Sequence, residues 1–192
     1  MPRAWLERGK VAKPGHSVSA GVAAENVACY RRGWPVLLYI LVITKGDLMA
    51  ESYNPDNVWT PFGAFSMVVL QGTGQVVHLK GQVALDASGA IIGAGDMRAQ
   101  VRQTLTNIKT VLATIGGRMS DVMSLTHYTT DIQSFMQTGD IRKEFFAAPY
   151  PVTTTVEVAA LYNPELVIEI TAVAEIPDER YMRPSQAQAM HE

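Results

Sequence analysis

The sequence has 192 residues, of which 47% are hydrophobic and 18% charged. This composition is typical of a globular domain with a buried core and excludes an intrinsically disordered, collagen-like or low-complexity chain. Residues 1–48 hold seven Lys or Arg and three acidic residues, a net charge of +4, whereas residues 49–192 carry a net charge of −6. An acidic body disfavours nucleic acid as a partner, because nucleic-acid binding needs a basic surface. The single cysteine, Cys29, excludes an internal disulfide and favours a reducing, cytoplasmic location.

The first 48 residues contain one long apolar run, residues 34–43. This run is too short to cross a bilayer, which takes ~20 apolar residues. No small-residue cleavage site of a signal peptide follows it. Met49 opens a segment that looks like a natural beginning. We therefore expect residues 1–48 to be an atypical extension, either disordered or an upstream stretch included by the choice of start site, and we expect no membrane partner.

The next part of the chain predicts three short strands. Two runs rich in Val, residues 66–70 and 75–80, flank a turn at residues 71–74, which is the pattern of a β-hairpin. A third run, residues 83–85, ends at the turn cluster 86–89.

A long amphipathic helix is predicted over residues 97–115. Asp96 is placed to cap its first turn, and Gly116 and Gly117 end it. The spacing of its apolar residues by three or four positions predicts one stripe that faces a sheet, formed by Met97, Val101, Leu105, Ile108 and Leu112. The basic residues Arg98, Arg102 and Lys109 are expected to point to solvent or to another subunit.

The second half of the chain predicts a strand over residues 123–130 and a helix over 131–146 capped by Asp131. Two further strands follow, over 153–160 and 166–174. The order βββαβαββ predicts an α+β fold, with one mixed sheet and two helices on one face. The last strand alternates between two faces, one formed by Leu166, Ile168, Ile170, Ala172 and Ala174 and the other by Val167, Glu169, Thr171 and Val173. Several strands carry apolar residues on both sides, so the second face of the sheet must be buried too. Oligomerisation is the simplest way to cover the second face of the sheet.

Few motifs in the sequence point to a particular chemistry. A complete phosphate-binding loop and a Gly-x-Ser-x-Gly nucleophile motif are both absent, and the four histidines lack the spacing of metal ligands. Glu169 stands out, because it lies in the middle of the apolar run 167–170. A carboxylate there must be hydrogen-bonded, paired or exposed in a cleft. The simpler alternative is an ordinary surface glutamate that faces outward.

Several segments together resemble the RidA family, also called the YjgF family. They are residues 80–83, 98–107, 121–146, 151–161 and 168–174, and the resemblance extends over residues 61–176. It implies a RidA-like domain at residues 49–177, followed by a polar C-terminal tail at 178–192. It also implies a chorismate-mutase-like fold that assembles as a homotrimer, in which the sheets form an inner β-barrel with three clefts between subunits.

The resemblance implies an activity and a site. Members of the family hydrolyse reactive imines and enamines, such as 2-aminoacrylate, to a carbonyl compound and ammonia, and they need no cofactor or metal. Glu169 matches the glutamate that positions the attacking water. Thr153 stands where the family has an arginine that holds the substrate carboxylate, Phe65 where it has a tyrosine, and Gly139 where it has an asparagine. A hydroxyl does not replace the charge of a guanidinium.

Other residues are candidates to bind the substrate beside Glu169. Lys80, which precedes Gly81 in a family motif, is a candidate anion anchor, and its alternative is a solvated lysine at a strand end. Thr153 and Thr155 are candidate hydrogen-bond donors, although threonine is also simply a good strand former.

We expect an imine or enamine deaminase with altered specificity, whose substrate either lacks an α-carboxylate or has it held differently. The alternative is a non-catalytic trimer that binds a small metabolite, as a sensor or in protein protection. Nucleic-acid cleavage, which has been attached to some relatives, is disfavoured by the acidic body.

Overall fold

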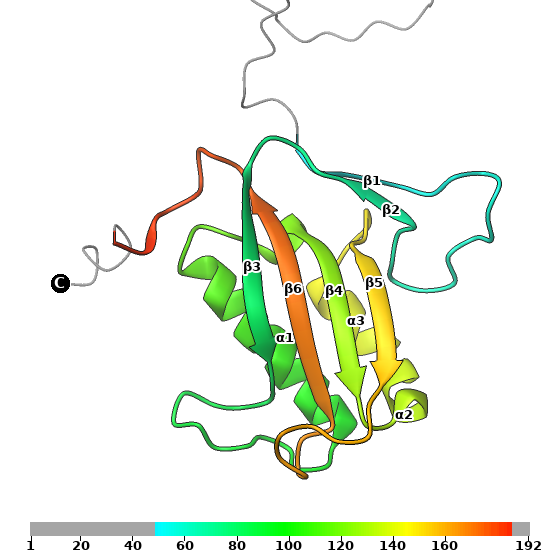
Figure 1. The fold of residues 1–192 in the computed structure, drawn as a ribbon, viewed down its shortest axis with the longest axis vertical. Coiled ribbons are helices and arrows are strands. Elements are labelled where there is room, and N and C mark those ends of the chain that lie inside the picture. The colour runs from blue at the N-terminus through cyan, green and yellow to red at the C-terminus, as the bar shows by residue number, and fades with distance from the viewer. Residues whose placement is uncertain (1–48, 186–192) are drawn as a thin grey trace, which may run out of the picture. The chain divides into compact units, whose positions relative to one another are not determined.

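The computed structural model describes residues 49–185. The predictions for residues 1–48, including the apolar run and Cys29, and for the last residues of the tail lie outside this part. The chain forms, in order, β1 (Glu51–Tyr53), β2 (Val68–Leu70), β3 (Gln75–Gln82), α1 (Met97–Ala113), the 3₁₀ helix η1 (Met119–Asp121), β4 (Val122–Thr129), α2 (Ile132–Met136), α3 (Gly139–Phe145), β5 (Val152–Glu157) and β6 (Ile168–Ile176) (Figure 1).

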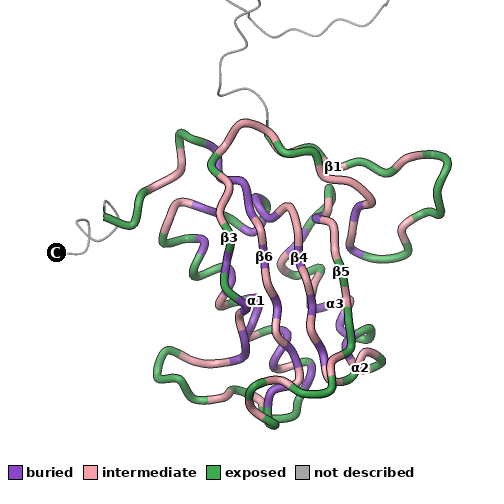
Figure 2. The backbone as a smooth tube through the Cα atoms, viewed as in Figure 1, coloured by how far each residue is buried: buried purple, intermediate pink, exposed green. Residues whose placement is uncertain are grey.

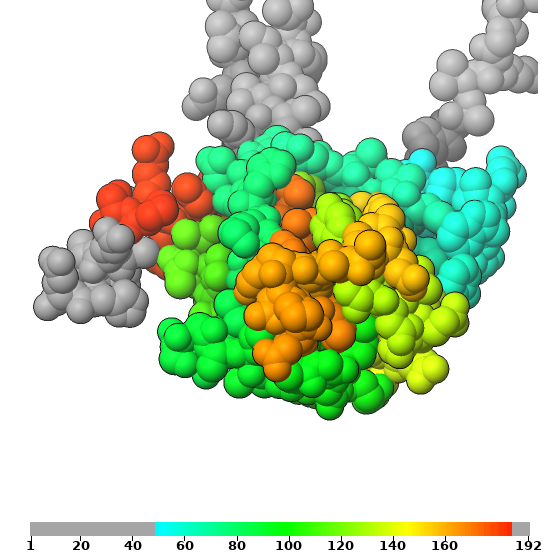
Figure 3. Space-filling view, turned by 60° about the horizontal axis from the view of Figure 1, so that its bottom comes forward, coloured from blue at the N-terminus to red at the C-terminus, as the bar shows by residue number. Residues whose placement is uncertain are grey.

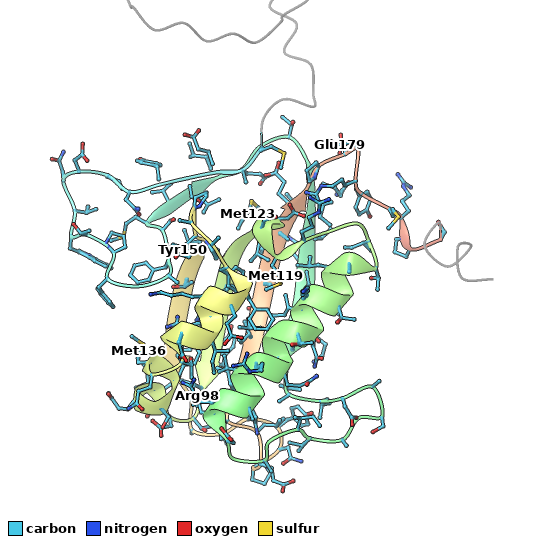
Figure 4. All side chains as sticks on the ribbon, turned by 180° about the vertical axis from the view of Figure 1, so that it is seen from behind. Arg98, Met119, Met123, Met136, Tyr150 and Glu179 are labelled. Carbon is cyan, nitrogen blue, oxygen red and sulfur yellow. The ribbon has the colours of Figure 1, made fainter. Side chains whose placement is uncertain are left out.

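One mixed sheet carries the fold. Its four strands lie in the order β3-β6-β4-β5, with β4 and β5 parallel and the other neighbours antiparallel. The helices cover one face of this sheet, and the view from behind shows α1 and α3 side by side there (Figures 1 and 4). This arrangement confirms the predicted α+β class and the placement of the helices. No helix among residues 49–185 has both the length and the apolarity needed to cross a membrane.

The alternation of residues along the strands separates the two faces of the sheet. Along β6, Ile168, Ile170, Ala172 and Ala174 are buried against the helices, whereas Glu169, Thr171 and Val173 are only partly covered (Figure 2). The predicted stripe of α1 is buried as expected, and Leu105, Ile108 and Leu112 are wholly inaccessible. Full burial of such a side chain stabilises the fold by about 2 kcal/mol. The core therefore lies between α1 and one face of the sheet.

The predicted hairpin of residues 66–70 and 75–80 is wrong. β2 pairs instead with β1, a strand that the sequence analysis missed, and β3 pairs with β6. The intervening turn is fixed by the buried Glu175, whose carboxylate accepts hydrogen bonds from Gly72 N and Gly74 N at 2.7 Å each. These bonds hold the turn to β6, so that the segment before it leaves the main sheet.

The predicted third strand, residues 83–85, is reduced to a single bridge between Leu85 and Ile91. The backbone carbonyls of Val83 and Leu85 accept hydrogen bonds from Asn107 Nδ2 on α1, at 3.0 and 2.8 Å, instead of from a neighbouring strand. The loop that follows lies beside the loop between β5 and β6 at this end of the molecule (Figure 3). Gln100 joins the two loops, because its Nε2 donates to Gly93 O and Glu165 O.

The helix predicted over 131–146 is divided into α2 and α3. The side-chain hydroxyl of Thr138 donates to the carbonyl of Phe135 at 2.7 Å and ends the first segment. Arg98 and Arg102 of α1 do not point only to solvent, because they form ion pairs with Asp140 and Glu144 of α3. These ion pairs join the exposed sides of α3 and α1.

The segment after β6 is held against the body of the domain. Arg180 donates to both carboxylate oxygens of the buried Asp121, at 2.9 and 2.6 Å, and to Gly116 O at 2.9 Å. Met182 N donates to Ile115 O. The first residues of the predicted polar tail are thus tied to the C-terminal end of α1.

Candidate functional site

A pocket of about 360 Å³ lies between the segment before β2, the two short helices and β5. It is lined by Trp59, Phe62, Gly63, Ala64, Phe65, Met136, Gly139, Arg142, Lys143, Thr153 and Thr155. Four of these residues, Phe65, Gly139, Thr153 and Thr155, are site residues that the sequence predicted. The fold therefore brings them together from three separate parts of the chain.

Aromatic side chains form one wall of the pocket. Trp59 and Phe62 stack with ring centroids 5.7 Å apart, and Phe65 meets both edge-on at 5.9 and 5.4 Å. Ser66 N donates to Pro151 O at 3.0 Å and so fixes this segment beside the start of β5. Trp59 is 60% exposed and Phe62 77% exposed, so this wall presents aromatic surface to solvent.

The threonines of β5 lie on the helix-covered face of the sheet. In the parallel pairing of β4 with β5, Thr153 lies opposite Leu125, and Thr155 lies opposite the buried His127. The Oγ1 atom of Thr155 lies 3.0 Å from Nδ1 of His127. Burial, aided by the positive charge of Arg142, lowers the pKa of His127 to about 3. The imidazole beside Thr155 is therefore neutral at physiological pH.

Arg142 is a pocket residue that the sequence analysis missed. Its guanidinium lies over the ring of Phe135, with Cζ 4.9 Å from the ring centroid. Its Nε atom is buried without a hydrogen-bond partner, and no carboxylate among residues 49–185 pairs with this side chain. Burial lowers the pKa of Arg142 from its ordinary value, but arginine stays charged in proteins. The pocket thus holds a partly desolvated, unpaired cation.

Gly139 leaves space at the N-terminal end of α3. A Cβ atom at this position would meet only Nη2 of Arg142, at 3.9 Å. Replacement of a longer polar side chain by glycine would therefore open the pocket beside the guanidinium.

Glu169 lies on the other face of the sheet. In the antiparallel pairing of β4 with β6 it lies opposite Tyr128, and its carboxylate occupies the space beside Gly81. Its Cδ atom would lie 2.7 Å from a Cβ atom on Gly81, so a side chain at this position would displace the carboxylate. Lys80 is exposed, and its Nζ donates to Gly81 O at 3.2 Å. Within one chain, the predicted site residues thus form two groups, Glu169 with Lys80 and Gly81, and the pocket residues.

Comparisons with known proteins identify the family. The family described as Endoribonuclease L-PSP matches residues 57–176. The chain is 32% identical over 126 residues to a RutC family protein of Pyrococcus horikoshii, an alignment that covers 66% of this chain and 98% of the relative. It is 34% identical over 116 residues to a 2-iminobutanoate/2-iminopropanoate deaminase of Dermatophagoides farinae, which covers 60% of this chain and 89% of that protein.

Solved structures agree with this match. The Rid family protein YyfB from Yersinia pestis is 33% identical and superimposes with a TM-score of 0.59, covering 66% of this chain and 98% of its own. RidA from an Antarctic Psychrobacter is 27% identical with a TM-score of 0.50, covering 66% and 99%. The chain belongs to the RidA family, and its α+β fold is the chorismate-mutase-like fold of that family. That Thr153 replaces the arginine of the family stays a prediction.

Proposed function

We propose that this protein hydrolyses reactive imines or enamines to a carbonyl compound and ammonia. Glu169 is the catalytic residue of this proposal. Its carboxylate deprotonates a water molecule that attacks the C=N carbon, and it then returns the proton to the departing nitrogen. One water is consumed, the C–N bond breaks, and ammonia leaves. The 2-iminobutanoate/2-iminopropanoate deaminase among the relatives supports this reaction class. The proposed partner is a small molecule, and neither nucleic acid nor a cofactor is required.

The proposal for the assembly rests on one observation: the predicted site residues lie on two opposite faces of the sheet. Glu169 shares a face with Tyr128, whereas Thr153 and Thr155 share the opposite face with His127. A single chain therefore cannot close both groups around one small molecule. A homotrimer that packs the partly covered faces of its sheets together would bring Glu169 of one protomer to the pocket of its neighbour. We propose three such clefts between subunits. A cytoplasmic location rests only on the cysteine content.

Ammonia release tests the reaction. Freshly generated imines of several amino acids and amines are mixed with the wild-type protein, Glu169→Gln or Glu169→Ala. We expect turnover by the wild-type protein and a loss of about 100-fold or more in kcat for both variants, since neither side chain takes up the proton from water. Equal rates for all three proteins would contradict a catalytic role of Glu169.

The alternative is a non-catalytic trimer that binds a small metabolite. The observation in its favour is that the pocket lies away from Glu169 within one chain, so that it could bind a ligand without the acid. Retained ligand binding without turnover on any imine would favour this function.

A further inference from the structure

The pocket carries an excess of positive charge. Its lining includes the two cations Arg142 and Lys143 and no carboxylate. The acids that lie nearest to Arg142 along α3, Asp140 and Glu144, are both engaged elsewhere. Asp140 accepts from Arg98 Nη1 at 3.1 Å, and Glu144 accepts from Arg102 Nη2 at 2.9 Å. The charge of Arg142 is therefore not neutralised by its own helix.

The guanidinium of Arg142 is held in position by its surroundings. The ring of Phe135, which is wholly buried, lies beneath it. Thr153 and Thr155 line the same pocket, and the hydroxyl of Thr155 also lies 3.0 Å from Nδ1 of His127. The hydroxyl of Thr153 can donate a hydrogen bond to a ligand. Gly139 places no side chain in front of the guanidinium. A planar guanidinium that has no carboxylate partner among residues 49–185, beside a hydroxyl donor, matches the geometry of a carboxylate.

The aromatic wall supplies the second half of the recognition. Trp59 and Phe62 present exposed ring surface beside the half-buried Phe65. Exposed aromatic groups beside a few polar groups are typical of a site for an apolar ligand. A ligand that satisfies both parts of the pocket carries a carboxylate at one end and an aromatic ring at the other.

We propose that Arg142 binds the substrate carboxylate from α3, and that the substrate is a 2-imino acid with an aromatic side chain. Hydrolysis of this substrate rests on the proposed function, whereas binding of its carboxylate by Arg142 does not. This assignment gives the anion-binding role to Arg142 rather than to Lys80, which lies on the other face of the sheet. It also explains how the pocket can bind a carboxylate although Thr153 on β5 carries no positive charge.

Calorimetric titration with phenylpyruvate, the keto acid that such an imine would yield, tests the binding. Phenylacetone, which keeps the ring but lacks the carboxylate, and pyruvate, which lacks the ring, are the comparison ligands. We expect phenylpyruvate to bind at least 10-fold more tightly than either. Arg142→Met should weaken phenylpyruvate by about 10- to 100-fold and leave phenylacetone unchanged. Lys109→Met, which removes the same charge on the exposed side of α1, is the matched control and should bind as the wild type.

Three results would overturn the proposal. They are unchanged phenylpyruvate binding in Arg142→Met, loss of that binding in Lys80→Met, or an equal loss for phenylacetone, which would mark a merely structural role. The double variant Arg142→Met/Thr153→Arg returns a guanidinium to the pocket from β5 and should recover most of the lost affinity. No recovery at all would also count against the proposal.

The outcome is separable from that of the proposed function. Glu169→Gln should abolish turnover but bind phenylpyruvate as the wild type does. A protein without imine turnover that still binds phenylpyruvate through Arg142 refutes the deaminase and keeps the anion site. Imine turnover that does not depend on Arg142 would keep the deaminase and refute the anion site.

Discussion

The space beside Gly81 decides where the carboxylate of Glu169 can lie. A Cβ atom at this position would overlap that carboxylate. Gly81→Ala should therefore displace Glu169 and lower imine turnover by about 100-fold, as loss of a positioned general base does. Steady-state ammonia release measures this effect.

Gly89→Ala is the control for the loss of a glycine. Its φ of +84° strains any other residue, but no atom lies near the added methyl group. It should lower stability by about 1 kcal/mol and keep turnover. If both variants lose activity in proportion to their stability, the close approach of Gly81 and Glu169 has no special role.

His127 should make stability depend on pH between about 6.5 and 5, above the range in which most carboxylates titrate. Burial, with a smaller effect of the Arg142 charge, lowers its pKa to about 3, well below the 6.5 of an exposed histidine. Between these values the unfolded chain binds a proton that the folded chain does not. The stability is thus fully present above pH 6.5 and falls by about 1.4 kcal/mol per pH unit as pH decreases towards 3.

Urea unfolding of the wild type and His127→Gln at pH 7, 6 and 5 measures this slope. Between pH 6 and 5, unfolding of the variant should take up about one proton fewer than unfolding of the wild type. Equal slopes would show that the imidazole is protonated in the folded protein.

The predictability of the site differs from residue to residue. Phe65, Gly139, Thr153 and Thr155 were predicted because they match positions of a known motif, and the fold places them in one pocket, whereas their role in binding stays a prediction. Arg142 was missed because it lies in what the periodicity shows as one helix. The interruption near Thr138 resets the helical phase, so the direction of a side chain beyond it does not follow from the spacing.

Among the elements, the segment after β6 depends on one ion pair. The side chain of Asp121 is only 4% exposed, and Arg180 is its partner. Arg180→Met leaves a buried carboxylate without its cation and should lower the free energy of unfolding by about 3 kcal/mol. Arg98→Met breaks an ion pair whose arginine is 53% exposed, and should cost less than about 1 kcal/mol. Chemical denaturation of both variants compares the two costs, and equal losses would contradict this difference in burial.

The helices and strands that could be predicted were those with a strong periodic pattern in their own sequence. The α1 stripe and the alternation of β6 are strong periodic patterns, and both were confirmed. The pairing of β2 failed because strand partners depend on distant contacts. The turn signal at residues 71–74 is real, but Glu175, about a hundred residues later, decides where the turn leads.

At the scale of the whole molecule, mixed assemblies test the proposed clefts. Glu169→Ala removes the acid, and Gly139→Trp fills the pocket. In a site shared between neighbours, co-expression of the two inactive chains should restore about a quarter of the wild-type turnover, because each mixed trimer regains one intact cleft. Light scattering should give a mass about three times that of the 20.9 kDa chain.

If the co-expressed chains show no turnover, either the acid and the pocket act within one chain or the chains do not assemble. A monomeric mass would refute the trimer directly. The same samples without substrate should bind phenylpyruvate only through chains that keep the glycine at position 139.

The opposite directions of Glu169 and Thr155 have a consequence for the life of the protein. If the proposed clefts form between subunits, a newly made chain carries both groups of site residues but cannot use them alone. Activity would then begin only when chains assemble, and strong dilution would stop it without any inhibitor. Synthesis rate and local crowding, rather than a regulatory ligand, would then set when this protein starts to work.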